Sequence, residues 1–233
     1  MVEATGVVLA GGDSTRFGDA NKAVATLDGR PLVAHVVGAV DAATEATPTV
    51  AVRTDAQRAD LEDALARPVR FVRDRPGGGP LAGLVAAATA AETPELVVVG
   101  CDMPLASARV LRWLRDERRP AGRLDAVVAC DAEGRPQPLH GAYATDLVAG
   151  LGVGEHDGRL DAVERAASRV RRVAPADAPP DASLARSMTN VNTRADLRAV
   201  RRTDGADDGV GTERPAPERA HRVFWDALQE FYG

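Results

Sequence analysis

The 233-residue sequence predicts an α/β protein built on a Rossmann-like, doubly wound and mostly parallel sheet. Three observations lead to this class. Short apolar runs alternate with longer, alanine-rich runs through residues 6–200, at intervals of roughly 25 residues. The apolar runs are continuous, as expected of strands covered on both faces. A glycine-rich segment follows the first apolar run, where ligands of such sheets bind.

Strands and helices are expected to follow one another in pairs. The runs predicted to be strands are short and apolar: 6–9, 49–52, 69–72, 96–100 and 126–130. The runs predicted to be helices are longer and rich in alanine: 31–40, 55–66, 81–91, 107–117 and 159–167. We expect these elements to form a single domain over residues 1–202.

The C-terminal region differs in character from this domain. Residues 203–220 are polar and rich in Gly, Pro and Asp, which is typical of a flexible linker. Residues 221–233 predict a short amphipathic helix, because their aromatic and leucine side chains recur at helical spacing. Such a helix could bind a protein partner or fold back onto an apolar patch of its own domain. The sequence leaves both open.

Composition and charge exclude several classes of protein. No run approaches the ~18 consecutive apolar residues of a membrane helix, and the N-terminus lacks the pattern of a secretory signal. Cys101 and Cys130 are too few for a disulfide framework or a four-ligand zinc site, so we expect free thiols in the cytoplasm. A net charge of −5 argues against a nucleic-acid partner.

The segment after the first predicted strand reads L-A-G-G-D-S-T-R-F-G over residues 9–18 and reaches Lys22 four residues later. Its glycines let backbone N–H groups approach a polyanion, which Arg16 and Lys22 can neutralise. The spacing matches neither the dinucleotide fingerprint nor the P-loop. Lys22 is the single lysine among 29 basic residues. It indicates a tight phosphate contact at which a guanidinium cannot replace an ammonium.

The string L-A-G-G-x-S-x-R-F-G-x-x-x-K resembles the signature of the nucleotidyltransferases that include the molybdenum cofactor guanylyltransferase family, the MobA-like enzymes. Members more often carry Met where Phe17 stands and Asp where Asn21 stands. The resemblance extends over about residues 6–200 and implies a sheet of the nucleotide-diphospho-sugar transferase type. It assigns nucleotide binding in this loop to Leu9, Ala10, Gly11, Gly12 and Lys22.

A second segment, residues 74–84, contains the string G-P-L-A-G-L. By resemblance, Asp74 lies near the guanine and ribose, and Gly79, Pro80 and Leu81 shape the nucleotide pocket. A rigid proline turn starts a helix whose N-terminal amides can face an anion, which agrees with that role.

In a third segment, residues 97–104, an apolar strand ends at Asp102. A carboxylate there is well placed to hold Mg²⁺, which binds one or two carboxylates together with phosphate oxygens and water. The family uses this aspartate as a metal ligand, so the resemblance implies Asp102 as the Mg²⁺ and nucleotide ligand. With Arg16 and Lys22 it forms the predicted catalytic set. Cys101 is interpreted as a buried small hydrophobe.

Two later segments resemble the part of the family's site that binds the acceptor. Residues 190–197 read N-V-N-T-R-A-D-L, and alternation puts Asn190 and Asn192 on one side of an extended chain. Asp196 could instead cap the final helix. Arg135 precedes a P-L-x-G-x-Y string and could meet an acceptor phosphate. His140 lies inside that string, and we interpret it as structural rather than catalytic.

The family reaction transfers GMP from GTP to the phosphate of molybdenum-bound molybdopterin and releases pyrophosphate. The acceptor phosphate is itself the nucleophile, so charge neutralisation and in-line positioning are what the site must supply. Three alternatives stay open: a relative that uses CTP, one with another acceptor such as cobinamide phosphate, phospholactate or a sugar phosphate, and a non-catalytic nucleotide-binding adaptor. The G-P-L-A-G-L and N-V-N-T strings favour the molybdenum branch.

Overall fold

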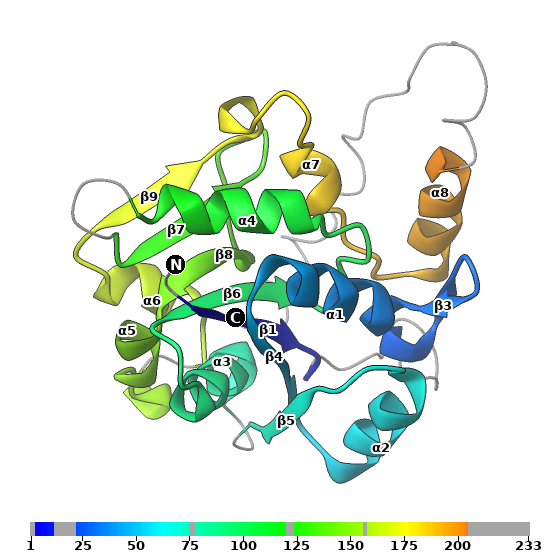
Figure 1. Ribbon diagram of the computed structural model, residues 1–233, viewed down its shortest axis with the longest axis horizontal. Coiled ribbons are helices and arrows are strands. Elements are labelled where there is room, and N and C mark those ends of the chain that lie inside the picture. Colours follow the sequence, from blue (N-terminus) through cyan, green and yellow to red (C-terminus); the bar gives the residue numbers. More distant parts are fainter. Residues whose placement is uncertain (1–2, 12–21, 75–77, 120–123, 156–157, 205–233) are drawn as a thin grey trace.

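The computed structural model describes residues 3–11, 22–74, 78–119, 124–155 and 158–204. In this part of the chain seven strands form one sheet in the order β5-β4-β1-β6-β8-β7-β9 (Figure 1). The strands of this sheet are β1 (Ala4–Leu9), β4 (Ala46–Val52), β5 (Arg70–Arg73), β6 (Glu95–Gly100), β7 (Ala126–Cys130), β8 (Pro136–Ala144) and β9 (Val170–Val173). The predicted α/β class is confirmed.

The helices largely follow the predicted order, with shifted ends. They are α1 (Leu32–Ala43), α2 (Asp55–Ala64), α3 (Gly79–Ala90), α4 (Ala108–Glu117), α5 (Thr145–Ala149), α6 (Asp161–Ala166), α7 (Leu184–Ser187) and α8 (Arg194–Asp204). A short 3-10 turn, η2 (Lys22–Val24), precedes a two-stranded ribbon of β2 (Thr26–Leu27) and β3 (Arg30–Pro31). The predicted domain end at residue 202 falls inside α8. The linker 203–220 lies almost wholly, and the tail helix 221–233 entirely, outside the described residues.

The sheet is mostly parallel, as predicted, with one antiparallel strand. β4 and β6 both pair in parallel with β1, whereas β8 runs antiparallel to both β6 and β7. The chain passes from β1 outward through β4 to β5 and then returns to β6 on the other side of β1. This reversal makes a topological switch point at the carboxyl ends of β1 and β6, where ligands of doubly wound sheets bind.

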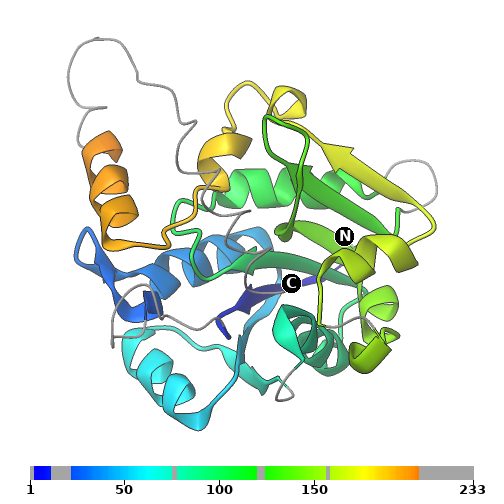
Figure 2. The ribbon, with the colours of Figure 1, turned by 180° about the vertical axis from the view of Figure 1, so that it is seen from behind.

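Helices cover both faces of the sheet (Figures 1 and 2). Helices α1 and α4 pack on one face in a core that includes Val8, Val97 and Val127. Helices α3, α5 and α6 pack on the other, against the alternate side chains Val7 and Val98. Neighbouring strand residues thus point into different cores, which is why the apolar runs in the sequence are continuous.

A third, smaller core joins the β2–β3 ribbon to the C-terminal end of the described chain. Leu27 and Leu32, from the β2–β3 ribbon and the start of α1, pack with Val191, Leu197 and Val200 around α8. The ribbon turns through Asp28 and Gly29, both with positive φ, as a two-residue Asp-Gly hairpin requires. This core places the segment after α7 against the β2–β3 ribbon and the start of α1.

The other end of the sheet holds a buried ionic cluster. Glu95, at the start of β6, is 3% exposed, and its carboxylate pairs with Arg115 and Arg118, which are each 3% exposed. Arg115 also pairs with Glu45 at 2.8 Å. Every charge here has an opposite partner, which buried ions require.

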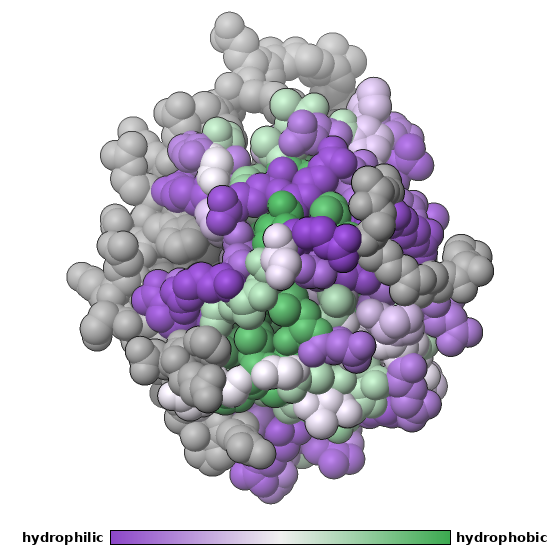
Figure 3. All heavy atoms as spheres, turned by 90° about the vertical axis from the view of Figure 1, so that its left-hand side faces the viewer, coloured by the Kyte–Doolittle hydropathy of each residue, from purple (hydrophilic) through white to green (hydrophobic). Residues whose placement is uncertain are grey.

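The two edge strands of the sheet carry arginines. Arg70 and Arg73 lie on β5, and Arg171 and Arg172 on β9. Arg171 and Arg172 pair with Glu117 and with a glutamate of α6, respectively. Figure 3 shows the face on the β9 side, where apolar surface is flanked by hydrophilic side chains. Charged edges of this kind oppose pairing with the strands of another chain.

Both cysteines are free and buried, and the burial agrees with the interpretation of Cys101 as a buried small hydrophobe. Among the described residues, no helix is long and apolar enough to cross a membrane.

Candidate active site

Three of the predicted site residues meet at the switch point. The Nζ atom of Lys22 lies 3.1 Å from Oδ2 of Asp102 and donates a 2.9 Å hydrogen bond to Oδ1 of Asn192. Lys22 begins η2, Asp102 lies two residues beyond β6, and Asn192 precedes α8. Three motifs far apart in the sequence therefore form one polar cluster.

The segment that carries Asn192 is held in place from two sides. The backbone N–H of Val191 donates to the backbone carbonyl of Asp102 at 2.7 Å. The carboxylate of Asp196 accepts from the N–H groups of Asn192 and Thr193, and Oγ1 of Thr193 accepts from the Asp196 N–H. Asp196 and Thr193 thus cap the start of α8 reciprocally, which confirms the structural role considered for Asp196.

The electrostatics of the cluster keep Lys22 charged. Burial works against its charge, but the carboxylate of Asp102, together with that of Asp196, outweighs this effect, and the pKa of Lys22 is raised above its usual value. The side chains of Lys22 and Asp102 are only 17% and 16% exposed, so water screens the pair weakly. Burial raises the pKa of the Cys101 thiol to about 12, so this residue is not a nucleophile at neutral pH.

A second polar group lies at the carboxyl ends of β1, β4 and β5. The side chain of Arg53 packs over Gly11, and its Nη1 donates to the Gly11 carbonyl at 3.4 Å. A Cβ atom at residue 11 would lie 2.9 Å from Oδ2 of Asp74, so glycine is needed for this close approach. Burial raises the pKa of Asp74, and Arg53 and Arg73 oppose that shift. Oδ1 of Asp74 is buried without a hydrogen-bond partner among the described residues, which is an arrangement that calls for an explanation such as a role in binding.

The start of α3 is in contact with the backbone of a distant segment. Gly79 has a φ of 55° and lies against the backbone of Gly158, whose φ is 70°. The Leu81 N–H donates to the Gly158 carbonyl at 3.1 Å, and Pro80 has no N–H. The expected helix start at Pro80 is confirmed, but the Leu81 amide contacts protein and does not face an anion. Gly79, Pro80 and Leu81 remain predicted pocket residues.

The remaining predicted acceptor residues make local contacts. The guanidinium of Arg135 pairs with Asp131 at 2.7 Å and with Glu133 at 2.9 Å, within the turn between β7 and β8. Nδ2 of Asn190 donates weakly to the Met188 carbonyl at 3.4 Å, while its Oδ1 is buried without a partner in the described part of the chain. The structure thus joins Asn192 to the Lys22 cluster, whereas Arg135 and Asn190 make no such contact with the residues that the structure describes.

His140 is a core residue, in agreement with its structural interpretation. Its side chain is fully buried, and its Nε2 lies 3.0 Å from Oγ of Ser187. The same oxygen accepts from the Ser107 N–H at 2.9 Å. Burial lowers the pKa of His140 to about 3, so the ring is neutral near pH 7.

Two predicted residues of the glycine-rich loop, Gly12 and Arg16, lie outside the described residues. Leu9 ends β1, and Ala10 follows it beside the site. The sequence reasoning missed Arg53 and Gln57, the two polar residues that contact Ala10 and Gly11. Their position supplies a usable signal, since Arg53 comes directly after an apolar strand run, where binding residues of a parallel sheet gather.

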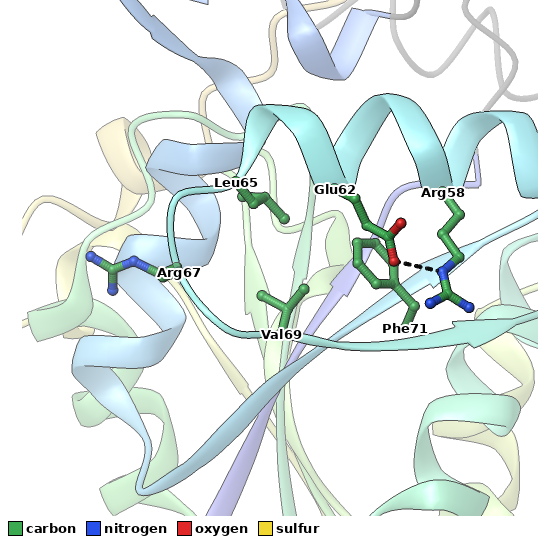
Figure 4. A pocket seen from close by; sticks show the side chains of 6 residues that line it. All are labelled: Arg58, Glu62, Leu65, Arg67, Val69 and Phe71. Atoms are coloured by element: carbon green, nitrogen blue, oxygen red, sulfur yellow. Dashed lines mark hydrogen bonds and ion pairs between the residues drawn. The ribbon is translucent and has the colours of Figure 1, made fainter.

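A shallow hollow of about 230 Å³ lies between α2 and β5 (Figure 4). Its lining includes Leu65, Val69 and Phe71, and the Arg58 guanidinium stands 5.5 Å from the Phe71 ring centre. Arg58 also pairs with Glu62 at 2.8 Å. The hollow lies beside the beginning of β5, away from the carboxyl ends of the strands, so it is no part of the site.

Sheet order and polar groups at the switch point together define a nucleotide-binding α/β protein of the doubly wound class. The family model described as the MobA-like NTP transferase domain matches residues 6–170. A probable molybdenum cofactor guanylyltransferase of Natronomonas pharaonis is 32% identical over 212 residues, which cover 86% of this chain and 98% of that relative. One of Deinococcus radiodurans is 34% identical over 199 residues, covering 84% and 93%. The chain belongs to the MobA-like NTP transferase family and is a nucleotidyltransferase-family enzyme.

A solved structure supports the fold independently. The molybdopterin-guanine dinucleotide biosynthesis protein A of Archaeoglobus fulgidus superimposes with a TM-score of 0.71 at 23% identity, covering 86% of this chain and 98% of that one.

Proposed function

We propose that this enzyme transfers GMP from GTP to the phosphate of molybdenum-bound molybdopterin and releases pyrophosphate. The observation that carries the proposal is the cluster in which Lys22 bridges Asp102 and Asn192. It links the predicted nucleotide-binding lysine and metal ligand to the predicted acceptor segment at one point. Relatives that share about a third of their residues with this chain are named molybdenum cofactor guanylyltransferases, which supports the same substrates.

The reaction brings two polyanions together, so the site must first offset their repulsion. Lys22 places a positive charge at the switch point, where the phosphates of a nucleotide bound at the carboxyl ends of β1 and β6 would lie. Its contacts with Asp102 and Asn192 restrict the Nζ atom to one position before substrate arrives. Preorganisation of this kind stabilises developing charge without a reorganisation cost during the reaction.

Mg²⁺ fits at Asp102. Oδ2 of this carboxylate contacts Lys22, and Oδ1 lies 2.6 Å from where a Cβ of residue 100 would stand, so Gly100 leaves the carboxylate room. The described residues contain no group of three or more His, Cys, Asp or Glu side chains that could hold a metal by themselves. A single protein carboxylate suits Mg²⁺, which keeps several waters and shares phosphate oxygens. When bound, the ion would neutralise charge on the triphosphate.

At the other end of the nucleotide, Asp74 supplies a hydrogen-bond acceptor. Its unpartnered Oδ1 can accept from an N–H or O–H of the base or ribose, which would relieve the cost of leaving it buried and unpaired. Asp102 follows β6 and Asp74 follows β5, at the same edge of the sheet. A nucleotide that lies along this edge would therefore have its phosphates at Asp102 and its base toward Asp74.

A product assay with purified enzyme, Mg²⁺, GTP and molybdenum-loaded molybdopterin tests the proposal. We expect a guanine dinucleotide and pyrophosphate in equal amounts, with GTP preferred over CTP and ATP in parallel reactions. Transfer from CTP, or to another phosphate acceptor only, would contradict the proposed substrates.

The same assay tests the residues. We expect Lys22→Ala and Asp102→Ala to lower turnover at least about 100-fold while the chain stays folded. The first removes the positive charge that would face the phosphates, and the second removes the carboxylate that would hold Mg²⁺. Arg165→Ala, which removes an exposed ion pair with Asp161, is the matched control and should leave turnover unchanged. Guanylyl transfer near the wild-type rate in both site variants would overturn this account.

A further inference from the structure

Strands β1 and β4 separate at their carboxyl ends, and the side chain of Gln57 lies between them. The last ladder bond runs from the Ala10 N–H to the Ala51 carbonyl at 2.9 Å. In a regular parallel ladder, the next bond would run from the Arg53 N–H to the Ala10 carbonyl. Here the Arg53 N–H donates to Oε1 of Gln57 at 2.9 Å, and Nε2 of Gln57 donates to the Ala10 carbonyl. The side-chain amide replaces the missing ladder bond.

The two contacts determine which way the amide is turned. A backbone N–H can only donate, so the atom facing Arg53 must be the amide oxygen. A carbonyl can only accept, so the atom facing Ala10 must be the NH₂ group. A glutamate of the same size could keep the first contact but would place a second oxygen against the Ala10 carbonyl. Position 57 therefore requires a side chain with both an acceptor and a donor.

The contact with Gln57 also orients the next peptide. In the preceding peptide, the Leu9 carbonyl accepts from the Cys101 N–H on the β6 side, while the Ala10 N–H faces β4. Gln57 draws the Ala10 carbonyl toward β4. In a planar trans peptide the carbonyl and the following N–H point in opposite directions, so the Gly11 N–H is turned toward β6 and the switch-point crevice. It has no acceptor among the described residues.

We propose that Gln57 is a positioning residue for nucleotide binding, which holds the Ala10–Gly11 peptide so that the Gly11 N–H donates to an acceptor atom of the bound nucleotide. The inference rests on the proposed function, because it places a nucleoside triphosphate in that crevice. It extends the site to a side chain on α2 that itself need not touch the substrate.

Gln57 also takes part in the cap of α2, so a purely structural role must be separated from positioning. Its backbone N–H donates to Oγ1 of Thr54 at 3.1 Å, and this bond helps to start the helix. The chain offers a matched pair of variants. Thr54→Ala removes the cap bond and leaves the Ala10 contact in place, whereas Gln57→Glu keeps the Arg53 contact and removes the donor to Ala10.

The experiment measures the dissociation constant of GTP with Mg²⁺ by titration calorimetry at about pH 8, where a glutamate is ionised, and the melting temperature of each chain. For Gln57→Glu we expect GTP to bind about ten-fold more weakly, the loss of one well-placed hydrogen bond to a charged ligand. For Thr54→Ala we expect a lower melting temperature and GTP affinity within about two-fold of wild type, since only the cap is lost.

Two results would overturn the inference alone: wild-type GTP affinity in Gln57→Glu, or an equal loss of affinity in Thr54→Ala. The second would mean that the stability of α2 matters, and the Ala10 contact does not. A wild-type enzyme that binds no GTP would overturn the proposed function and this inference together.

Discussion

At the scale of single residues, the molecule uses lysine only where a compact ammonium fits. All other positive side chains are arginines, and many form exposed pairs such as Arg58–Glu62 and Arg165–Asp161. Lys22 instead occupies a space between two side-chain oxygens at 3.1 and 2.9 Å. A planar guanidinium is larger and carries its donors in a fork, so it cannot contact both oxygens in this geometry.

We expect Lys22→Arg to lower turnover about 100-fold although the charge is retained, because the cation is displaced from the phosphates. Steady-state kinetics with GTP as the varied substrate check this. Arg165→Lys, a change of the same kind at an exposed pair, serves as the control. If Lys22→Arg retained full turnover, charge alone would be sufficient at this position.

His140 gives the molecule an acid sensitivity that starts below neutrality. Its pKa is lowered to about 3 in the folded chain, against about 6.5 when unfolded. Between these values the unfolded state binds more protons, so folding stability falls as the pH falls. The full contribution is present above pH 6.5, and its loss has a limiting slope of about 1.4 kcal/mol per pH unit.

Chemical denaturation between pH 7 and 4.5 measures this dependence. Although His140→Gln should destabilise the core, its stability should decline less steeply with acid than that of the wild type, since glutamine does not titrate. Parallel slopes for the two proteins would show that other groups carry the acid sensitivity.

At the scale of elements, the backbone at the start of α3 crosses the backbone at Gly158. This contact determines where the G-P-L-A-G-L segment lies. Gly79 and Gly158 both have positive φ, and a Cβ on Gly158 would lie 2.5 Å from the Gly78 carbonyl oxygen. Two segments that are far apart in the sequence are thus in backbone contact, which only glycine permits at these positions.

We expect Gly158→Ala to cost about 3 kcal/mol or more of unfolding free energy, because backbone strain and a clash add together. Gly134→Ala is the control: its φ is also positive, at 78°, but nothing lies within 4 Å of the added Cβ, so strain alone should cost about 1 kcal/mol. Denaturant titration compares the two. Equal losses would mean that the crossing contributes nothing.

The elements that the sequence predicts well are those with continuous apolar runs. β1, β6 and β7 are buried along their whole length, so their composition alone identifies them. β8 was missed because two prolines and a histidine interrupt its nine residues, and β9 because two of its four residues are arginines. The β2–β3 ribbon is too short for periodicity, although its Asp-Gly turn was a readable signal.

The residues of the candidate site likewise fall into those that the sequence predicts and those that it does not. Lys22, Asp102 and Asn192 were predicted because each belongs to a motif, and their convergence follows from the topology of the sheet. Gln57 belongs to no motif. Its proposed function depends on one missing backbone hydrogen bond between β1 and β4, which the Gln57 amide replaces. A local sequence pattern carries no information about such a missing bond.

At the scale of the whole molecule, the two ends of the sheet have different tasks. The carboxyl ends carry the site, and the start of β6 carries the buried cluster of Glu95 with Arg115 and Arg118. Arg115 has a second carboxylate partner in Glu45, whereas Glu95 is the one carboxylate that pairs with Arg118 among the described residues.

We expect Glu95→Gln to destabilise the fold by about 3–5 kcal/mol, because it leaves buried positive charge unpaired. Asp161→Asn, which removes an exposed partner of Arg165, should cost no more than about 1 kcal/mol. Unfolding free energies of the two variants provide the comparison. A loss below about 1 kcal/mol for Glu95→Gln would show that water enters and solvates this cluster.

The hydrogen bond between Lys22 and Asn192 joins residues 170 positions apart. A growing chain leaves the ribosome N-terminus first, and domains begin to fold in that order. The glycine-rich loop, the sheet and Asp102 therefore all exist before the segment that completes the polar cluster has been synthesised. A chain truncated before residue 190 would present a charged lysine and aspartate without the asparagine that restrains them. The polar cluster is thus complete only once α8 packs onto the β2–β3 ribbon.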